Sequence, residues 1–164
     1  MTTSVAATSD VTLDAGLALR ILREGYGSGA WHGPDLRAAI SDVSSTLAFQ
    51  RPGAGRHNIA EIVMHHAYCV RSAIERLGGS PHAFPLTGED WFALNDEHNF
   101  HWSEIQALLE SLQSQLAAQT QELPASAHGA SEQMDLILGI TCHAVYHAGQ
   151  IQLIKALSKS SNNS

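Results

Sequence analysis

The sequence predicts an all-α fold, a four-helix bundle within a single domain. Three observations predict it: apolar residues recur at helical spacing in four long segments, strand signals are nearly absent, and 164 residues suit one domain. Because 44% of the residues are hydrophobic, the chain has enough apolar surface to bury a core. We expect one domain over residues 1–164, with frayed tails at 1–10 and 159–164.

The first predicted helix covers residues 13–26, where apolar side chains such as Leu17 and Ile21 recur at helical spacing until a glycine-rich stretch ends the segment. A short helical piece follows, with Pro34 in its first turn, because the amide nitrogens of a first turn have no partner within the helix. Residues 51–56 contain proline and two glycines, which predicts a loop before the second long helix.

The second long helix is predicted from Asn58, a residue type favoured at N-caps, to Leu77, where two glycines follow. The third covers residues 101–122 and the fourth residues 131–158. The long connection between the second and third helices permits a crossover. An inner apolar stripe is expected on the fourth helix at Ile137, Ile140, Ala144, Ile151 and Ile154.

Charge and hydropathy argue against two classes of partner. The formal net charge is −7, and the nine Lys and Arg residues are scattered, whereas nucleic-acid binders cluster such residues against phosphates. No apolar run approaches the roughly 20 residues of a membrane helix. The first ten residues lack the basic start and apolar stretch of a signal peptide. We therefore expect a cytoplasmic protein with no nucleic-acid or membrane partner.

The fourth predicted helix carries two histidines at metal-binding spacing, His143 and His147, in a chain that has ten histidines. Residues four apart project from one face of a helix, one turn apart, so two imidazoles can bind one ion. Two buried histidines without partners would be costly. The pair therefore predicts two ligands of a divalent-metal site. The alternative is a chance pair of hydrogen-bonded or surface histidines, and spacing alone does not separate the two.

The second helix offers a third ligand, either His65 or His66. The apolar stripe runs closer to His66, whereas His65 shares a face with Glu61 and Cys69, so periodicity leaves both open. Three imidazoles would leave coordination positions free, which is typical of catalytic rather than structural zinc sites. A carboxylate-bridged di-iron centre is disfavoured, because the fourth helix lacks the Glu-x-x-His pair it requires.

Three residues near these histidines are candidate catalytic groups. Glu61, one turn before His65, could orient a ligand or accept a proton. Gln150, three residues past His147, could hydrogen-bond near the metal, and Tyr146 could donate a proton. The simpler interpretations are that Glu61 is solvated, that Gln150 lies on a polar helix edge and that Tyr146 only packs against its neighbours.

Aromatic residues in predicted loops are candidates for a pocket mouth. Trp31-His32 follows the first helix, and Asp90-Trp91 lies in the long connection. His57, just before the second helix, is a further candidate for the pocket.

Four stretches of the chain resemble the DinB superfamily, also called DinB/YfiT-like metalloenzymes. They are WHGP at 31–34, HNIAEIVMHHA at 57–67, DW at 90–91 and, most specifically, HAVYHAGQI at 143–151. The resemblance implies a four-helix bundle of up-up-down-down topology, commonly a homodimer. It also implies a divalent metal bound by three histidines.

The resemblance favours His65 as the third ligand. When the family's pattern for the second helix is laid on this chain without gaps, the ligand falls on His65, and His66 replaces the usual apolar residue. His143 and His147 match the two remaining ligands. Nickel or zinc is the expected metal, with iron or manganese as further candidates.

The superfamily includes transferases that use low-molecular-weight thiols. The resemblance therefore implies an activity like that of a thiol S-transferase, acting on a small-molecule electrophile with a thiol cosubstrate. One alternative is a metal-dependent hydrolase that uses metal-bound hydroxide. Another is a non-catalytic, stress-related bundle that binds a metal or a ligand.

Overall fold

A computed structural model of the chain describes residues 13–27, 29–88, 90–124 and 130–161. The described residues form helices and no strand, which confirms the all-α prediction. The long helices are α1 (Ala15–Gly25), α4 (Ile59–Arg76), α5 (Trp102–Gln121) and α6 (Ala130–Ser161), and the short ones are α2 (Leu36–Ile40) and α3 (Ser45–Phe49).

The predicted boundaries of the long helices hold to within a few residues, and two details differ. Helix α3 was not predicted, and Pro34 precedes Asp35, the N-cap of α2, instead of lying within its first turn. Of the predicted frayed tails, residues 1–10 and 162–164 lie outside the described residues, whereas 159–161 continue α6.

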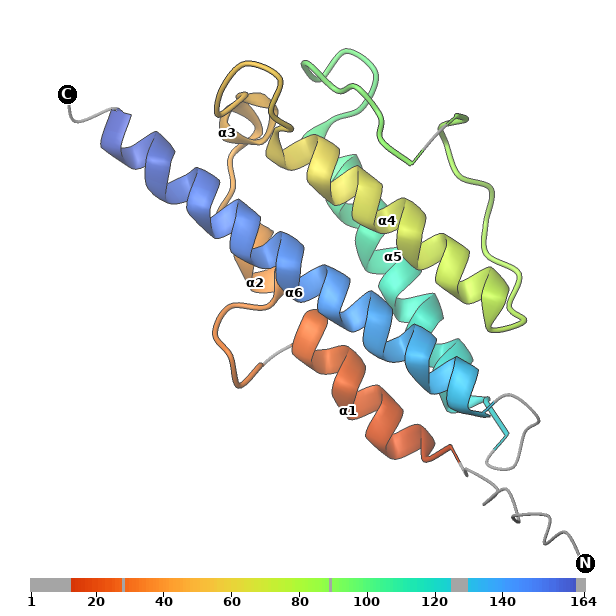
Figure 1. The fold of residues 1–164 in the computed structure, drawn as a ribbon. Helices are drawn as coiled ribbons and strands as arrows, with labels where there is room; N and C mark the ends of the chain where they lie inside the picture. Colours follow the sequence, from red (N-terminus) through yellow and green to blue (C-terminus); the bar gives the residue numbers. More distant parts are fainter. Residues whose placement is uncertain (1–12, 28, 89, 125–129, 162–164) are drawn as a thin grey trace, which may run out of the picture.

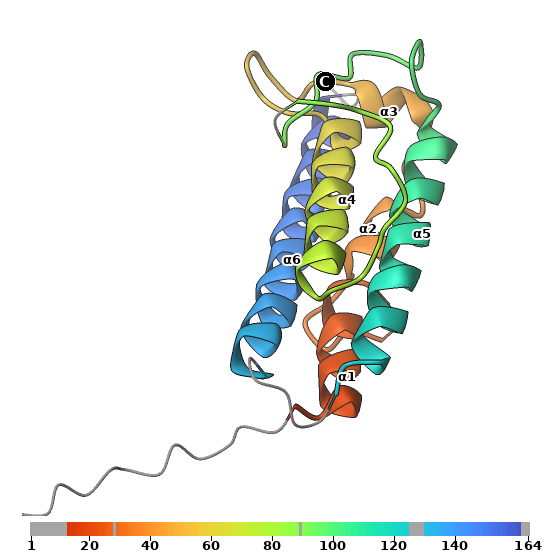
Figure 2. The ribbon, with the colours of Figure 1, turned by 90° about the vertical axis from the view of Figure 1, so that its right-hand side faces the viewer.

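The four long helices pack side by side as a bundle (Figure 1). Going round it, α1 contacts α6, α6 contacts α4, α4 contacts α5, and α5 contacts α1 again. Figures 1 and 2 show that α1 and α6 run in one direction and that α4 and α5 run in the other. The order along the chain is therefore up-down-down-up, which corrects the expected up-up-down-down order. The segment with α2 and α3 reaches the end of the bundle at which α4 begins, so α4 runs back antiparallel to α1.

The long connection, which permitted a crossover, does join α4 to α5 as one and runs the length of the bundle (Figure 2). It returns the chain to the end where α4 began, which makes α4 and α5 parallel. Phe92 and Leu94 of this connection are buried in the core. Asn58, the N-cap of α4, ties the connection down, because its Nδ2 donates to the carbonyl oxygen of Leu94 at 2.6 Å. Its Oδ1 accepts from the amide nitrogen of Glu61 at 2.8 Å, as an N-cap should.

The core lies along the bundle axis, and the predicted inner stripe of α6 belongs to it: Ile137, Ile140, Ala144, Ile151 and Ile154 are all buried. In the part of the chain that the structure describes, no helix is both long enough and apolar enough to cross a bilayer.

Candidate metal centre

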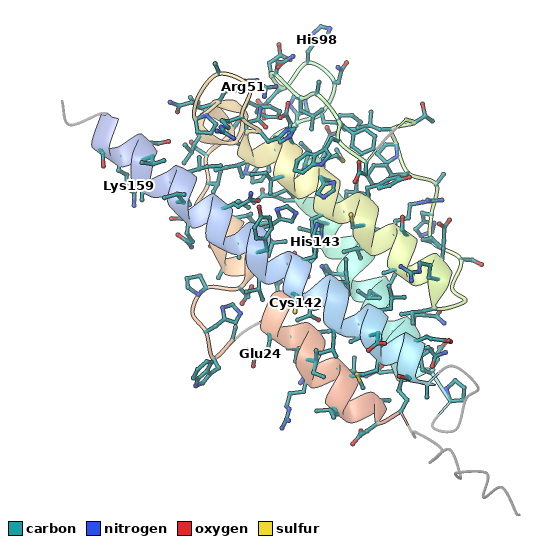
Figure 3. The ribbon with its side chains drawn as sticks, in the orientation of Figure 1. Glu24, Arg51, His98, Cys142, His143 and Lys159 are labelled. Atoms are coloured by element: carbon teal, nitrogen blue, oxygen red, sulfur yellow. The ribbon has the colours of Figure 1, made fainter. Side chains whose placement is uncertain are left out.

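Three histidines from two helices meet in the middle of the bundle. His65 comes from α4, and His143 and His147 come from successive turns of α6. The Nε2 atom of His143 lies 3.2 Å from that of His65 and 2.9 Å from that of His147. One ring nitrogen from each residue lies within 4.8 Å of the others. Figure 3 shows His143 on the side of α6 that faces α4, with Cys142 on the opposite side. We call His65, His143 and His147 the triad.

Two rings of the triad are oriented by acceptors on their other nitrogen. The Nδ1 atom of His65 lies 2.8 Å from the backbone carbonyl oxygen of Asp90. The Nδ1 atom of His147 lies 2.6 Å from Oε1 of Gln150. Because these oxygens only accept hydrogen bonds, both Nδ1 atoms carry the proton and donate it. Each Nε2 atom therefore presents a lone pair to the centre of the triad, as a metal ligand must.

His143 is backed by a histidine that does not belong to the triad. Its Nδ1 atom lies 3.0 Å from Nδ1 of His66, and the Nε2 atom of His66 lies 3.1 Å from the side-chain nitrogen of Gln113 on α5. His66 is fully buried, which agrees with its place beside the apolar stripe predicted on α4. The structure thus brings His65 to the triad and places His66 behind it.

Trp91 of the crossover covers the triad from outside. Its ring stacks on that of His65, with centroids 4.0 Å apart and planes 4° from parallel. It also stacks on His57, with centroids 3.8 Å apart. Trp91 was expected at a pocket mouth and lies at one, whereas Trp31 is 92% exposed and lines neither of the two cavities beside the triad.

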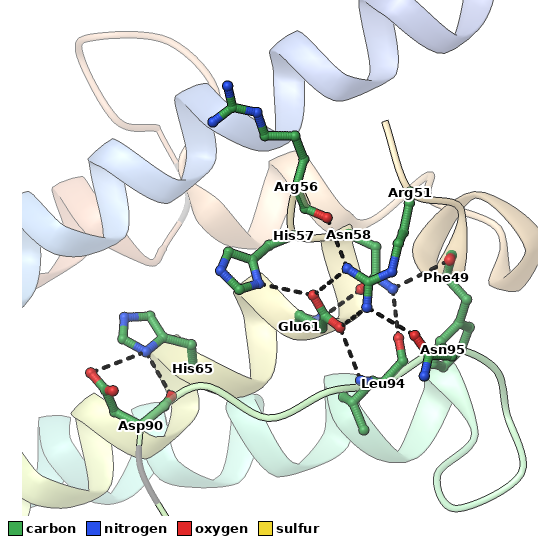
Figure 4. Close-up of polar contacts among 10 residues, drawn as sticks. All are labelled: Phe49, Arg51, Arg56, His57, Asn58, Glu61, His65, Asp90, Leu94 and Asn95. Carbon is green, nitrogen blue, oxygen red and sulfur yellow. Dashed lines mark hydrogen bonds and ion pairs between the residues drawn. The ribbon is translucent and has the colours of Figure 1, made fainter. Parts of the chain in front are cut away.

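Glu61 is buried and ionised, and it acts on the triad only indirectly. Its carboxylate accepts hydrogen bonds from Arg51, from Nδ1 of His57 at 2.9 Å and from the amide of Leu94 at 3.0 Å (Figure 4). Burial alone would raise its pKa, but these hydrogen bonds hold the pKa below the usual range. Glu61 positions His57 under Trp91, so its described contacts are those of a positioning residue rather than a proton acceptor at the triad.

Gln150 and Tyr146 extend the hydrogen bonds of His147 outward. The side-chain nitrogen of Gln150 donates to the Tyr146 hydroxyl at 3.0 Å. This contact orients the amide so that its oxygen faces His147. Tyr146 itself is 62% exposed, at the surface of the site.

His66, His143 and His147 are neutral near pH 7. Burial lowers the pKa of His147 to about 4, although its hydrogen bond with Gln150 opposes the shift. Burial, followed by the neighbouring histidines, lowers the pKa of His143 and lowers that of His66 much further. Neutral imidazole is the form that binds a metal, so His143 and His147 fit a divalent ion in charge state, and His65 and His147 fit it in orientation.

Cys69, one turn after His65, approaches the triad without joining it. Its sulfur lies 3.9 Å from Nε2 of His65. Burial and the nearby charge of Asp90 raise the pKa of the thiol to about 11. A thiol that stays protonated is a weak ligand.

Two cavities, each of about 640 Å³, open along α4 and α6, one on each side of the triad. The His143 pocket has His143 in its wall, together with Tyr68, Cys69, Arg76, Asp90 and Asp135. The His147 pocket has His147 in its wall, together with Arg56, His57, Trp91, Leu153 and Leu157.

Several of these site residues were not found from the sequence. Arg51 and Gln113 are distant from the triad along the chain, and neither belongs to a recognisable motif. The one available signal was that Gln113 directly follows Leu112, a residue of the inner stripe of α5.

Comparison with known protein families agrees with the geometry. The DinB superfamily matches residues 30–151, about three quarters of the chain. The search of curated proteins found no match, nor did the search of solved structures. The matched range holds His65, His143 and His147, and the chain belongs to the DinB superfamily.

Proposed function

We propose that this protein is a divalent-metal enzyme that transfers a low-molecular-weight thiol to a small electrophile. The observation that carries the proposal is the convergence of three Nε2 atoms, two of which are fixed as lone-pair donors by the partners of their Nδ1 atoms. A divalent ion held there, nickel or zinc in preference to iron or manganese, would supply Lewis acidity and lower the pKa of a coordinated thiol.

The surrounding residues support a reaction between two molecules. His143 lines one pocket and His147 the other, so two reactants can reach the triad from opposite sides. Trp91 excludes water from the outer face of His65 by stacking on it. This arrangement favours a transferase over a hydrolase, which needs only one organic substrate. A cytoplasmic location and a homodimer, the latter implied by the resemblance to the DinB superfamily, are part of the same proposal.

The first test is the metal content of protein purified without a histidine tag. After reconstitution with nickel, zinc, iron or manganese in turn, we expect about one equivalent per chain for the preferred ion. The variant with His65, His143 and His147 all replaced by Ala should retain none. His98→Ala, at an exposed histidine outside the triad, is the matched control and should bind as the parent does. Less than about half an equivalent in the parent protein would contradict the proposal.

The second test is thiol dependence. The metal-loaded protein is assayed with 1-chloro-2,4-dinitrobenzene, with and without bacillithiol or glutathione. Conjugation that requires both the metal and the thiol supports the transferase. Turnover that persists without thiol would favour the hydrolase, and tight metal binding with no turnover of any electrophile would favour the non-catalytic binder.

A further inference from the structure

The guanidinium of Arg56 is the one permanent charge among the described residues in the wall of the His147 pocket. The other ionisable side chains there are those of His57, Tyr146 and His147, and no carboxylate is present. The sign of the charge in this pocket is opposite to that of the chain as a whole, which has a formal net charge of −7. A pocket of this kind favours an anion.

The guanidinium of Arg56 is available to a ligand. Its neighbour Arg51 is held by Glu61 and by Asn95, whereas no carboxylate of the described residues pairs with Arg56. Figure 4 shows the Arg56 side chain pointing away from Glu61, and only its backbone carbonyl bonds to Arg51. An arginine at a pocket wall that pairs with no carboxylate of the described residues can bind a carboxylate ligand through two parallel hydrogen bonds.

Apart from Tyr146 and Gln150, which are hydrogen-bonded to each other, the remaining wall of the His147 pocket is largely apolar. Ile62 of α4 and Ile154 of α6 form its floor, and Leu153 is 60% exposed at its side. A volume of about 640 Å³ is within the range of small-molecule sites. The pocket therefore suits an apolar body that ends in an anionic group.

The His143 pocket has the opposite charge. Asp90, Glu132 and Asp135 line it against a single cation, Arg76. The two pockets meet at the triad, so ligands of opposite charge would reach the same centre from opposite sides.

We propose that the His147 pocket is the binding site for an apolar carboxylic acid. The carboxylate binds the Arg56 guanidinium, the apolar body packs between Ile62 and α6, and the other end of the molecule points toward His147. The inference deepens the proposed function by naming the substrate class of one pocket. It rests on that function only for the identity of the reacting end.

The test compares two probes of the same shape, 4-phenylbutanoate and its uncharged amide, 4-phenylbutanamide. Each is titrated by calorimetry into the full-length protein at low salt, once metal-free and once zinc-loaded. We expect the carboxylate to bind about tenfold more tightly than the amide in both forms, as one charge-assisted hydrogen-bond pair provides. Arg56→Gln should abolish this preference. Arg76→Gln, the matched loss of an arginine from the His143 pocket, should leave it unchanged.

Three results would overturn the proposal. They are equal affinity for the two probes, no binding of either, and a preference that survives in Arg56→Gln. If the carboxylate binds only the zinc-loaded protein, and Arg56→Gln does not change its affinity, then the carboxylate is bound to the metal. This case counts as the third result. The titration of the metal-free protein needs no ion, so it can fail while the metal site is intact. Metal content tests the metal site separately.

Discussion

The Nδ1 atoms of His66 and His143 face each other across 3.0 Å, so only one of them carries a proton. If Nε2 of His143 is to bind a metal, its Nδ1 must hold the proton and donate it to His66. The Nε2 atom of His66 then carries a proton of its own, which the amide oxygen of Gln113 must accept, with that amide turned round. With that amide turned round, His66 and Gln113 would hold His143 in the tautomer that binds a metal.

His66→Leu, which restores an apolar residue, should weaken metal binding. The variant leaves the Nδ1 proton of His143 without an acceptor, and loss of such a partner typically costs a metal site about 10–100-fold in affinity. Competition with a chromophoric zinc chelator measures the change. Gln113→Glu should act in the opposite sense, because a carboxylate is a stronger acceptor for His66. If both variants weaken binding equally, the pair has only a packing role.

Trp91→Ala should also lower metal affinity, by up to about tenfold, since stacked aromatic pairs contribute about 0.5–1.5 kcal/mol each. The variant removes the ring that holds His65 and His57 parallel to it. The same chelator competition applies, and Trp31→Ala, at a 92% exposed tryptophan, is the control. Equal affinities in the two variants would show that the stack does not position His65.

Acid should destabilise the metal-free protein between about pH 6.5 and pH 4. The pKa of His147 is about 4 in the folded chain, against 6.5 for the unperturbed group. Above pH 6.5 His147 is neutral in both the folded and the unfolded chain, and its full contribution to the free energy of unfolding is present. As the pH falls, the unfolded chain takes up the proton first, and stability is lost at up to about 1.4 kcal/mol per pH unit for this histidine. Urea unfolding at several pH values measures the slope, and His147→Gln should flatten it.

The two cysteines should differ in reactivity toward iodoacetamide. Cys142 is exposed, whereas Cys69 is partly buried with its pKa raised to about 11, so little thiolate forms at pH 8. Mass spectrometry of the peptides should find Cys142 alkylated first, and Cys142→Ser should leave a slowly reacting protein. Faster modification of Cys69 would mean that the thiol is more accessible than its burial indicates.

Glu61→Gln should destabilise the fold by about 3 kcal/mol, because it leaves Arg51 without its buried counter-charge. Thermal or urea unfolding measures the loss. The control is Glu75→Gln, which breaks the more exposed pair with Arg71 and should cost about 0.5 kcal/mol. If Glu61→Gln lowers the free energy of unfolding no more than the control does, the Arg51–Glu61 pair contributes no more than a surface ion pair.

The sequence predicted the helices well because their signals are local. Asn58 caps α4, glycines follow its end, and the apolar stripe of α6 recurs at helical spacing. The order that the resemblance implied was wrong for two helices, because α4 and α6 each run opposite to their expected direction relative to α1. The direction of α4 depends on where the segment with α2 and α3 leads the chain, and no local pattern records that path.

The candidate site shows the same division. Residues four apart lie on the same face of a helix, so His143 and His147 could be paired from the sequence. The choice between His65 and His66 depends on small rotations of α4 about its axis, which periodicity does not resolve. Gln113 and Trp91 reach the site through tertiary packing alone, one from α5 and the other from the crossover.

The triad draws its ligands from α4 and α6, and this has a consequence for how the protein is made. During synthesis α4 leaves the ribosome long before α6, so His65 exists for most of translation with no second ligand near it. The centre forms only when the last helix docks. An ion could therefore be captured at the triad only late in biogenesis, and a chain truncated before His143 would lack two of the three histidines.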